Sequence, residues 1–243
     1  MSRPRIKKKR YELRRGRGIP STVPVEHVRE RINELHQLGL TNLMIGYAAG
    51  IGKATVGHIE NRSTQYTLVD VATRIFTVTH HPHPNQPTVL AIGARRRVRA
   101  LNALGWPTDE LAHQLGQSSR SGLNVAISGD YTTYNMWSRI RDLYNKLSGT
   151  PGPSARTASN AHRRGDAPPL AWDGRDIDDP RAQPDWAAAG IKLTQRPVCV
   201  NNHPYTPTNT FRDNRGNRQC RTCHSAATER QRAKRASRSK SAA

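Results

Sequence analysis

The chain has 243 residues, of which 39 are Lys or Arg and 18 are Asp or Glu, so its formal net charge is +21. Only 35% of the residues are hydrophobic. This content is too low for one large core to offset the entropy lost by ordering the whole chain. We therefore expect several small modules joined by solvated segments.

Two features of the composition bear on the compartment. No apolar run approaches the roughly 18 residues that span a bilayer, and no apolar stretch follows the basic start, so membrane insertion and secretion are disfavoured. The three cysteines cannot pair into a closed disulfide framework. This number of cysteines favours a reduced compartment or a metal site.

The positive charge is concentrated at the two ends of the chain. Residues 1–18 carry nine cations and one acid, and residues 199–243 carry ten cations and two acids. Residues 1–22 are predicted to be a basic disordered arm. The charge favours a polyanionic partner, because neutralising phosphates releases condensed counterions. Solvated tails without a specific ligand are the alternative.

Residues 23–79 are predicted to form a first helical module. Apolar residues recur at the steps that one helix face requires; they are Val25, Val28, Ile32, Leu35 and Leu38. Thr41 is expected to cap a second helix that ends at Gly50, and a third helix restarts at Lys53. A further helix is expected from Thr67, with one side formed by Leu68, Val71, Ala72, Ile75 and Phe76. Two short helices around a glycine-centred turn are typical of a helix-turn-helix.

The second short helix of this module carries candidate contacts to DNA on its outward face and just beyond its end. The candidates are Lys53, Thr55, His58, Asn61 and Arg62. Side chains of these types can reach base edges or phosphates from the major groove. Gly46 stands where this motif usually has Ala, which costs about 1 kcal/mol of helix propensity. A helical bundle with no nucleic-acid ligand is the alternative.

Residues 80–94 are predicted to be a linker, and residues 95–149 a second helix-turn-helix-like module. Its middle part matches the first module only after a register slip of one residue. The candidate DNA contacts of this module are Ser119, Arg120 and Asn124. The alternative is that the second module docks against the first or holds phosphates without reading bases.

Residues 150–197 are rich in Pro and Asp and are predicted to be a linker; residues 198–243 are predicted to be a zinc finger with a basic tail. The predicted metal ligands form a Cys-x3-His pair and a Cys-x2-Cys pair; they are Cys199, His203, Cys220 and Cys223. Tetrahedral zinc needs thiolate and imidazole donors about 2.0–2.3 Å from one point, and two such pairs around a short hairpin provide them. Four protein ligands leave no open position, so the expected role is structural.

Short segments between residues 23 and 184 resemble a family of actinobacterial and phage proteins that have two helix-turn-helix modules and are described as DNA-binding. They include Leu38-Gly39-Leu40-Thr41, Ala48-Ala49-Gly50, Ala103-Leu104-Gly105-Trp106, Pro169-Leu170-Ala171-Trp172-Asp173 and Ile177-Asp178-Asp179-Pro180. The end of the chain, residues 199–235, resembles the treble-clef zinc fingers of phage proteins, some of which are HNH nucleases. This likeness rests on Asn202-His203-Pro204-Tyr205-Thr206-Pro207 and Cys220-Arg221-Thr222-Cys223.

Together these patterns predict a mainly α fold with two small helix-turn-helix bundles, a Pro-rich linker, a C-terminal treble-clef zinc finger and basic disordered ends. The expected function is a non-enzymatic, zinc-containing, double-stranded DNA-binding transcription regulator of a phage or actinobacterium. It is expected in the cytoplasm with the nucleoid, with no membrane partner and no small-molecule substrate. The oligomeric state stays open.

Two other functions are alternatives to DNA regulation. An HNH-like nuclease would need a general-base His in the hairpin between the ligand pairs. The hairpin has no His between His203 and Cys220. The residues that remain for nuclease chemistry are Asp213 in the hairpin and His224 outside it. An RNA-binding protein is disfavoured because no interleaved aromatic stacking platform is visible.

Overall fold

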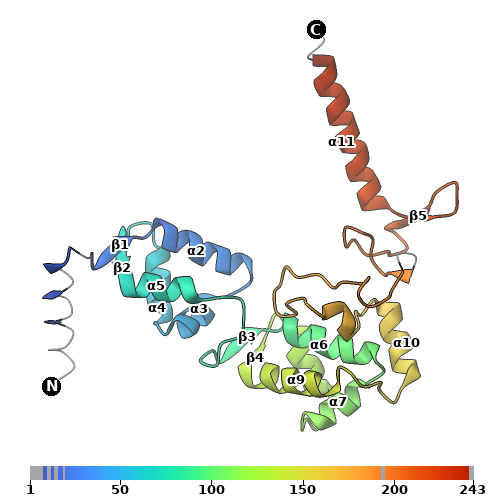
Figure 1. The fold of residues 1–243 in the computed structure, drawn as a ribbon, viewed down its shortest axis with the longest axis horizontal. Helices are drawn as coiled ribbons and strands as arrows, with labels where there is room; N and C mark the ends of the chain where they lie inside the picture. Colours follow the sequence, from blue (N-terminus) through green and yellow to red (C-terminus); the bar gives the residue numbers. More distant parts are fainter. Residues whose placement is uncertain (1–7, 10–11, 14–15, 19, 193–194, 241–243) are drawn as a thin grey trace. The chain divides into compact units, whose positions relative to one another are not determined.

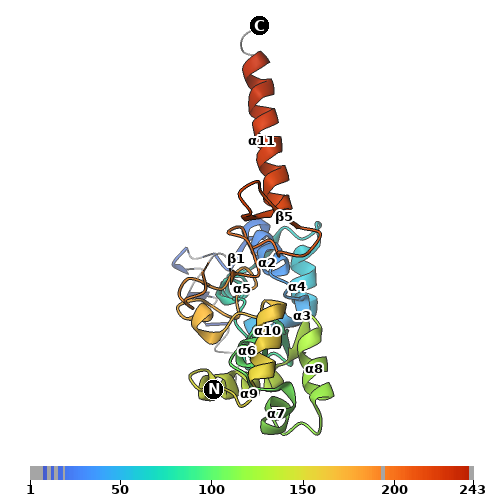
Figure 2. The same ribbon diagram turned by 90° about the vertical axis from the view of Figure 1, so that its right-hand side faces the viewer.

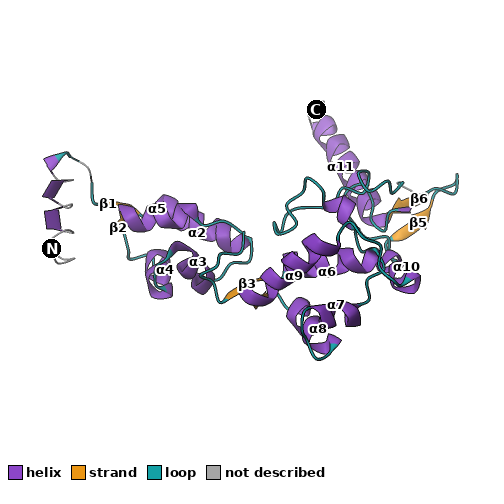
Figure 3. Ribbon diagram, turned by 60° about the horizontal axis from the view of Figure 1, so that its bottom comes forward, coloured by secondary structure: helices purple, strands orange, loops and turns teal. Residues whose placement is uncertain are grey.

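The computed structural model describes residues 8–9, 12–13, 16–18, 20–192 and 195–240, and side chains only up to residue 234. About 51% of the structure is helical, and the strands of the described residues form only short antiparallel pairs (Figure 3). The mainly α fold class is therefore confirmed. In the predicted basic disordered arm over residues 1–22, residues 1–7, 10–11, 14–15 and 19 lie outside the described residues, whereas residues 8–9, 12–13 and 16 are helical, which differs from the predicted disorder.

The first part of the chain follows the order strand, three helices, strand, helix (Figure 1). The elements are β1 (Thr22–Pro24), α2 (Glu26–Gln37), α3 (Asn42–Ala49), α4 (Lys53–Glu60), β2 (Tyr66–Leu68) and α5 (Val69–Thr77). Strands β1 and β2 pair antiparallel, with Val23 opposite Thr67. The helices lie where the apolar spacing predicts them. The strand pair was not predicted, because three residues are too few to show an alternating pattern.

One apolar cluster holds these helices together. Its buried members from the four helices and the residue before α2 are Val25, Val28, Ile32, Leu35, Met44, Ile45, Ala49, Val56, Ile59, Ala72 and Ile75. Two residues expected on the inward side of the last helix, Leu68 and Phe76, are instead 55% and 48% exposed. Leu68 ends β2 and precedes the helix, and Phe76 lies about 100° around the helix from the buried Ile75.

The ends of α3 agree with the predicted caps. The Thr41 hydroxyl accepts a hydrogen bond from the Met44 N–H at 3.3 Å, and Gly50 has a φ of +64°, the left-handed conformation that favours glycine. A Cβ at Gly46 would lie 3.0 Å from the Ile51 carbonyl oxygen and 3.1 Å from the Lys53 nitrogen. Close approach of the following turn therefore explains why glycine replaces alanine at residue 46.

The next part of the chain repeats the same order of elements. They are β3 (Thr88–Leu90), α6 (Ile92–Ala103), α7 (Thr108–Gln114), α8 (Arg120–Ser128), β4 (Tyr131–Thr133) and α9 (Tyr134–Leu147). Val89 of β3 lies opposite Thr132 of β4. Three residues lie between the left-handed Gly116 and the start of α8, against two between Gly50 and the start of α4, which accounts for the register slip.

Two segments predicted to be linkers contain regular structure instead. Residues 80–94 include β3, which pairs with β4, and the first residues of α6. Residues 150–197 include α10 (Ala155–Arg164) and the short 3-10 helix η1 (Pro169–Trp172). Ser154 caps α10 by accepting from the Thr157 N–H, and Trp172 and Trp186 are 8% and 6% exposed. The many prolines and aspartates of this segment gave no indication of the capped helix, whereas the burial of Trp172 and Trp186 agrees with the expectation that these two side chains pack.

The chain ends in a hairpin and a long helix. The strands β5 (Thr210–Arg212) and β6 (Arg218–Cys220) pair antiparallel, and α11 (Arg221–Lys240) continues directly from β6 as one helix (Figure 2). In the described part of the chain, no helix combines the length and the apolar character needed to cross a bilayer.

The chain divides into two compact units, and the boundary passes through α6. The first unit holds residues up to 95, 112–143 and 177–182, and the second holds residues 96–111, 144–176 and 183 onward. The predicted module over residues 95–149 is thus shared between the units. Each contact described below joins two residues of the same unit.

Candidate nucleic-acid surface and metal centre

The glycine turn at residues 50–52 presents α4 on the surface of the first helical module. Val56 and Ile59 of α4 are 0% and 1% exposed and join the apolar cluster. The opposite face of α4 is open to solvent, because the helix makes one buried stripe only. This arrangement fixes the helix through its inner face and leaves its outer face available to a ligand.

The predicted contact residues of the first module lie on or next to this outer face. Lys53, His58 and Arg62 are exposed, and Thr55 is half-buried. Asn61 is also exposed, but its side-chain oxygen accepts hydrogen bonds from the N–H and the hydroxyl of Ser63 at 3.0 and 2.9 Å. That oxygen therefore shapes the turn after α4, which the sequence analysis did not foresee.

An arginine from α2 holds the C-terminal end of α4. The Arg29 guanidinium donates to the carbonyl oxygens of Ile59, Asn61 and Thr64 at 3.1–3.2 Å. The Ile59 carbonyl lies in the last turn of the helix, where backbone oxygens lack helical partners, and the other two carbonyls follow the helix. A single cation thus fixes α4 and the turn after it relative to α2.

The second repeat has the same arginine in the same place. Arg95, like Arg29, is the fourth residue of its helix, and it donates to the carbonyl oxygens of Ile127 at 2.6 Å, of Ser128 and of Gly129 at the end of α8. The last helices also correspond. Arg74 of α5 donates to the Gly50 carbonyl at 3.2 Å, and Arg139 of α9 donates to the Leu115 carbonyl. The two repeats therefore share a supporting framework as well as an order of elements.

The predicted contacts of the second repeat lie at the start and on the outer face of α8. Ser119, Arg120 and Asn124 are all exposed, whereas Leu123 is 0% exposed. Leu123 therefore takes the inward place that Val56 has in α4. On the outer face of α8, the side chain of Val125 is 74% exposed. The outer face of α8 thus has a large exposed apolar side chain, which the outer face of α4 lacks.

The three cysteines and one histidine of the C-terminal segment meet at one point. Cys199 and His203 lie in a tight loop in which the Cys199 N–H donates to the His203 carbonyl, and Asn202 takes a positive φ of 59°. Cys220 ends β6 and Cys223 lies in the first turn of α11. All four donor atoms lie within 4.8 Å of one another, so this group could hold a metal ion.

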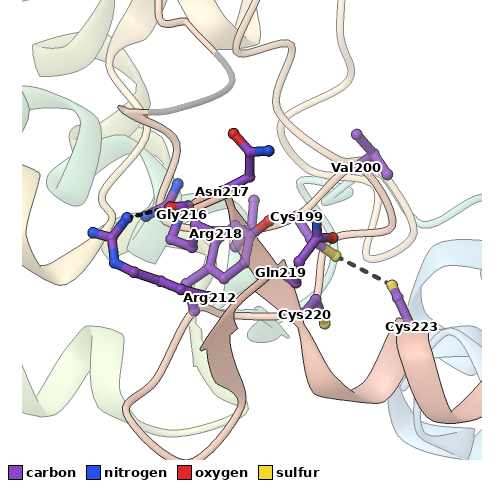
Figure 4. Close-up of a pocket in the computed structure, with 11 residues that line it drawn as sticks. Cys199, Val200, Arg212, Gly216, Asn217, Arg218, Gln219, Cys220 and Cys223 are labelled. Atoms are coloured by element: carbon purple, nitrogen blue, oxygen red, sulfur yellow. Dashed lines mark hydrogen bonds between the residues drawn. The ribbon is translucent and has the colours of Figure 1, made fainter. Parts of the chain in front are cut away.

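The measured separations suit a tetrahedral metal. The Cys199 Sγ lies 3.6 Å from the Cys223 Sγ (Figure 4). The His203 Nδ1 lies 3.6 Å from the Cys199 Sγ and 3.2 Å from the Cys223 Sγ. Ligands about 2.0–2.3 Å from a tetrahedral centre are about 3.3–3.8 Å apart. The cysteines form no disulfide, and Cys199 and Cys220 are buried. The donor set therefore could hold a metal ion.

Two asparagines that the sequence analysis did not identify support this cluster. The Asn201 amide donates to the Cys223 sulfur at 3.3 Å, and the Asn209 amide donates to the Cys220 sulfur at 3.4 Å. Burial opposes ionisation of Cys220, but hydrogen bonds from the Cys223 backbone N–H and from Asn209 outweigh it and lower the pKa of this thiol to about 6. Isolated asparagines carry no sequence signal that distinguishes them from turn residues.

Asn209 also joins the two halves of the cluster. Its amide donates to the Pro204 carbonyl at 2.7 Å, and its side-chain oxygen accepts from the N–H and hydroxyl of Thr222 at 3.1 and 2.8 Å. Outer-shell partners of this kind orient the ligands and typically contribute a factor of about 10–100 to metal affinity. Asn209 is therefore a positioning residue for the metal centre.

We expect Asn209→Ala to weaken metal binding by about 10–100-fold without abolishing it, because the four ligands remain. Competition with a chromophoric chelator measures this affinity in the full chain. Asn214→Ala, at an exposed position of the β5–β6 turn, serves as the matched control and should leave the affinity unchanged. Equal affinities of the two variants would contradict the role given to Asn209.

Asp213, the carboxylate of the nuclease alternative, already accepts hydrogen bonds from other residues of the hairpin. Asp213 accepts hydrogen bonds from the backbone N–H groups of Arg215 and Asn217 at 2.9 and 2.8 Å, and from the Gln219 amide at 3.0 Å. The backbone bond from Asn217 and the bond from Gln219 lower the pKa of Asp213. The His224 ring packs edge-on against Phe211, with centroids 5.3 Å apart. Both residues thus make structural contacts.

No protein-family model, no curated protein and no solved structure matches this chain.

Proposed function

We propose that this protein binds double-stranded DNA and regulates transcription, with α3 and α4 acting as a helix-turn-helix. The observation that carries the proposal is the exposed outer face of α4, where Lys53 and His58 project from a helix whose inner face is buried, with exposed Arg62 just after its end. A helix placed this way after a left-handed glycine turn presents its N-terminal residues to base edges.

The dimensions and charge of α4 suit the major groove. An α-helix with its side chains is about 10–12 Å in diameter, and the major groove is about 12 Å wide, so α4 can enter it. Lys53 stands at the N-terminus of α4, where the helix dipole also favours a phosphate. In this proposal Lys53 and Arg62 hold the backbone, whereas Thr55 and His58 contact base edges.

The second repeat supplies a second reading helix, α8. Arg95 and Arg139 donate hydrogen bonds to backbone carbonyls around α8. Arg29 and Arg74 make the corresponding bonds around α4. Ser119, Arg120 and Asn124 are the groups that it offers to DNA. Two modules on one chain raise the overall affinity, because the binding of one increases the effective concentration of the other.

The C-terminal segment is proposed to be a treble-clef finger that binds zinc. A loop with two ligands, a hairpin and a helix with a ligand in its first turn make up this arrangement, and three thiolates with one imidazole suit zinc. The metal would be structural and would supply no chemistry. Helix α11 places Arg221, Arg230 and Arg232 on its exposed surface, where they would contact phosphates.

Equilibrium titrations of the metal-loaded full chain test the regulator proposal. Sequences bound from a random duplex pool are compared with random duplexes at several salt concentrations, and we expect the selected sequences to bind about 10³-fold or more tightly. Lys53→Ala and Arg62→Ala should each reduce the salt slope by about 0.9, the value for one lost phosphate contact. His58→Ala should weaken discrimination among sequences.

Lys146→Ala is the matched control, since Lys146 is an exposed lysine of α9 outside the proposed contact set. Equal affinity for random and selected duplexes would remove the claim of regulation and leave binding driven by charge alone. Supercoiled plasmid incubated with Mg²⁺ or Mn²⁺ tests the nuclease alternative. Nicking that is lost in both Asp213→Ala and His224→Ala would replace the proposal with that alternative.

A further inference from the structure

The first helical module has an apolar groove that the DNA proposal does not use. It lies between α2 and α5 next to β1 and has a volume of about 840 Å³. Its apolar lining consists of Val23, Val28, Val69, Ala72 and Phe76, and Phe76 is 48% exposed. None of the candidate DNA contacts of α4 lines this groove. Phe76 is the large apolar side chain that this groove leaves exposed, whereas Val28 and Ala72 form a buried apolar floor beneath it.

The rim of the groove is acidic, although the chain as a whole is strongly basic. Glu26, Glu30 and Glu34 recur at every fourth residue of α2, so they lie in one row along the helix, and all three are exposed and line the groove. Among the residues that line the groove, one guanidinium stands beside this row, that of Arg31, which bonds to Glu34 at 2.8 Å and to the Val78 carbonyl. Glu34 also acts electrostatically on Arg181, which itself bonds to Asp179. His27 bonds to Glu30 at 3.2 Å. The row therefore presents net negative charge beside an apolar floor.

This combination excludes some occupants and favours another. A row of carboxylates repels DNA phosphates, so the groove is not an extension of the nucleic-acid surface. A second copy meeting the same face would bring a second acidic row against the first, and like charges in contact suppress such pairing. A ligand that has both apolar and cationic groups is complementary to the floor and the rim.

We propose that this groove binds a cationic amphipathic helix of a partner protein. In helix-in-groove recognition, apolar anchors at i, i+3 or i+4, and i+7 enter the groove while flanking charges set orientation and specificity. The 12 residues of α2 extend for about 18 Å, which matches about three turns of such a helix. Leucine-sized anchors would contact Phe76 and Val69, and flanking Lys or Arg would pair with Glu26 and Glu30.

A designed peptide tests the proposal without DNA, so its outcome is separable from that of the regulator proposal. The probe is a labelled helical peptide of about 15 residues with leucines spaced along one face and lysines on both flanks. Fluorescence anisotropy measures its binding to the metal-loaded full chain. A peptide with the same leucines and glutamates in place of the lysines is the charge control.

We expect the lysine peptide to bind and the glutamate peptide to bind at least about tenfold more weakly. Phe76→Ala and the pair Glu26→Gln with Glu30→Gln should each weaken the lysine peptide by about tenfold, because they remove the exposed anchor contact and the rim charge. These positions are exposed, so the fold should tolerate the changes. The matched controls are Leu170→Ala, a side chain that is 64% exposed elsewhere, and Glu229→Gln.

Three results would overturn the proposal. The first is failure of the lysine peptide to bind, and the second is binding that the groove variants change no more than the controls do. The third is self-association in sedimentation velocity that Phe76→Ala abolishes, because it would assign the groove to a second copy of this chain.

Discussion

Removal of the metal by a chelator, or the change Cys220→Ser, is expected to unfold the C-terminal finger. Beyond Trp186, the buried side chains of the described residues are those of Cys199 and Cys220 alone, and the two hairpin strands have three residues each. An apolar core of this size cannot order the segment. Structural zinc supplies an apparent 10–16 kcal/mol, roughly, in small fingers at neutral pH.

Amide NMR spectra of the full chain with and without metal measure this effect, together with the metal content by mass spectrometry. The amides of residues 198–222 should collapse to unfolded positions, whereas those of α2 to α5 should stay in place, because their own apolar cluster holds them. Val200→Ala is the control, since Val200 is next to Cys199 but 73% exposed, and it should keep one bound metal. A finger that stays folded after complete loss of metal would contradict the proposed role of the cluster.

The second large effect concerns the core under the proposed reading helix. Ile45 of α3 is 0% exposed and belongs to the apolar cluster that holds α4. Truncation of a buried isoleucine leaves a cavity and removes transfer free energy, so Ile45→Ala should lower the free energy of unfolding of this module by about 2–5 kcal/mol. DNA affinity should fall with it, because α4 is positioned by this cluster.

Amide hydrogen exchange in α2 and α5 measures this local stability within the intact chain. Leu43→Ala is the matched control, because Leu43 lies on the same helix but is 39% exposed and should cost less than about 1 kcal/mol. Similar losses of protection in the two variants would show that α3 is not held by its inward face.

The metal cluster and the first helices are the parts that the sequence predicted well. Each depends on local spacing: ligands in pairs separated by three and two residues, and apolar residues at helical steps. The capping residues Thr41 and Gly50 were identified for the same reason. The predicted linkers over residues 80–94 and 150–197 were wrong in their local structure, because composition alone does not show a strand partner or a cap.

The supporting residues depended on distant parts of the chain. Arg29 contacts a turn about 30 residues away, and Asn209 meets Cys220 and Thr222 across the hairpin. In the sequence both look like ordinary surface polar residues. The acidic row on α2 is readable in the sequence, but the groove beside it exists only because α5 packs against α2 and leaves Phe76 exposed.

The sequence by itself determined the charge distribution, the helical periodicity and the ligand pairs, since each is a property of neighbouring residues. Only the tertiary structure decided which outward faces are open, which carbonyls the arginines hold and how the four metal donors converge. The physical reason is that burial and hydrogen bonding depend on which segments meet in space, and strand partners such as β1 with β2 lie more than 40 residues apart. Local patterns cannot encode that pairing.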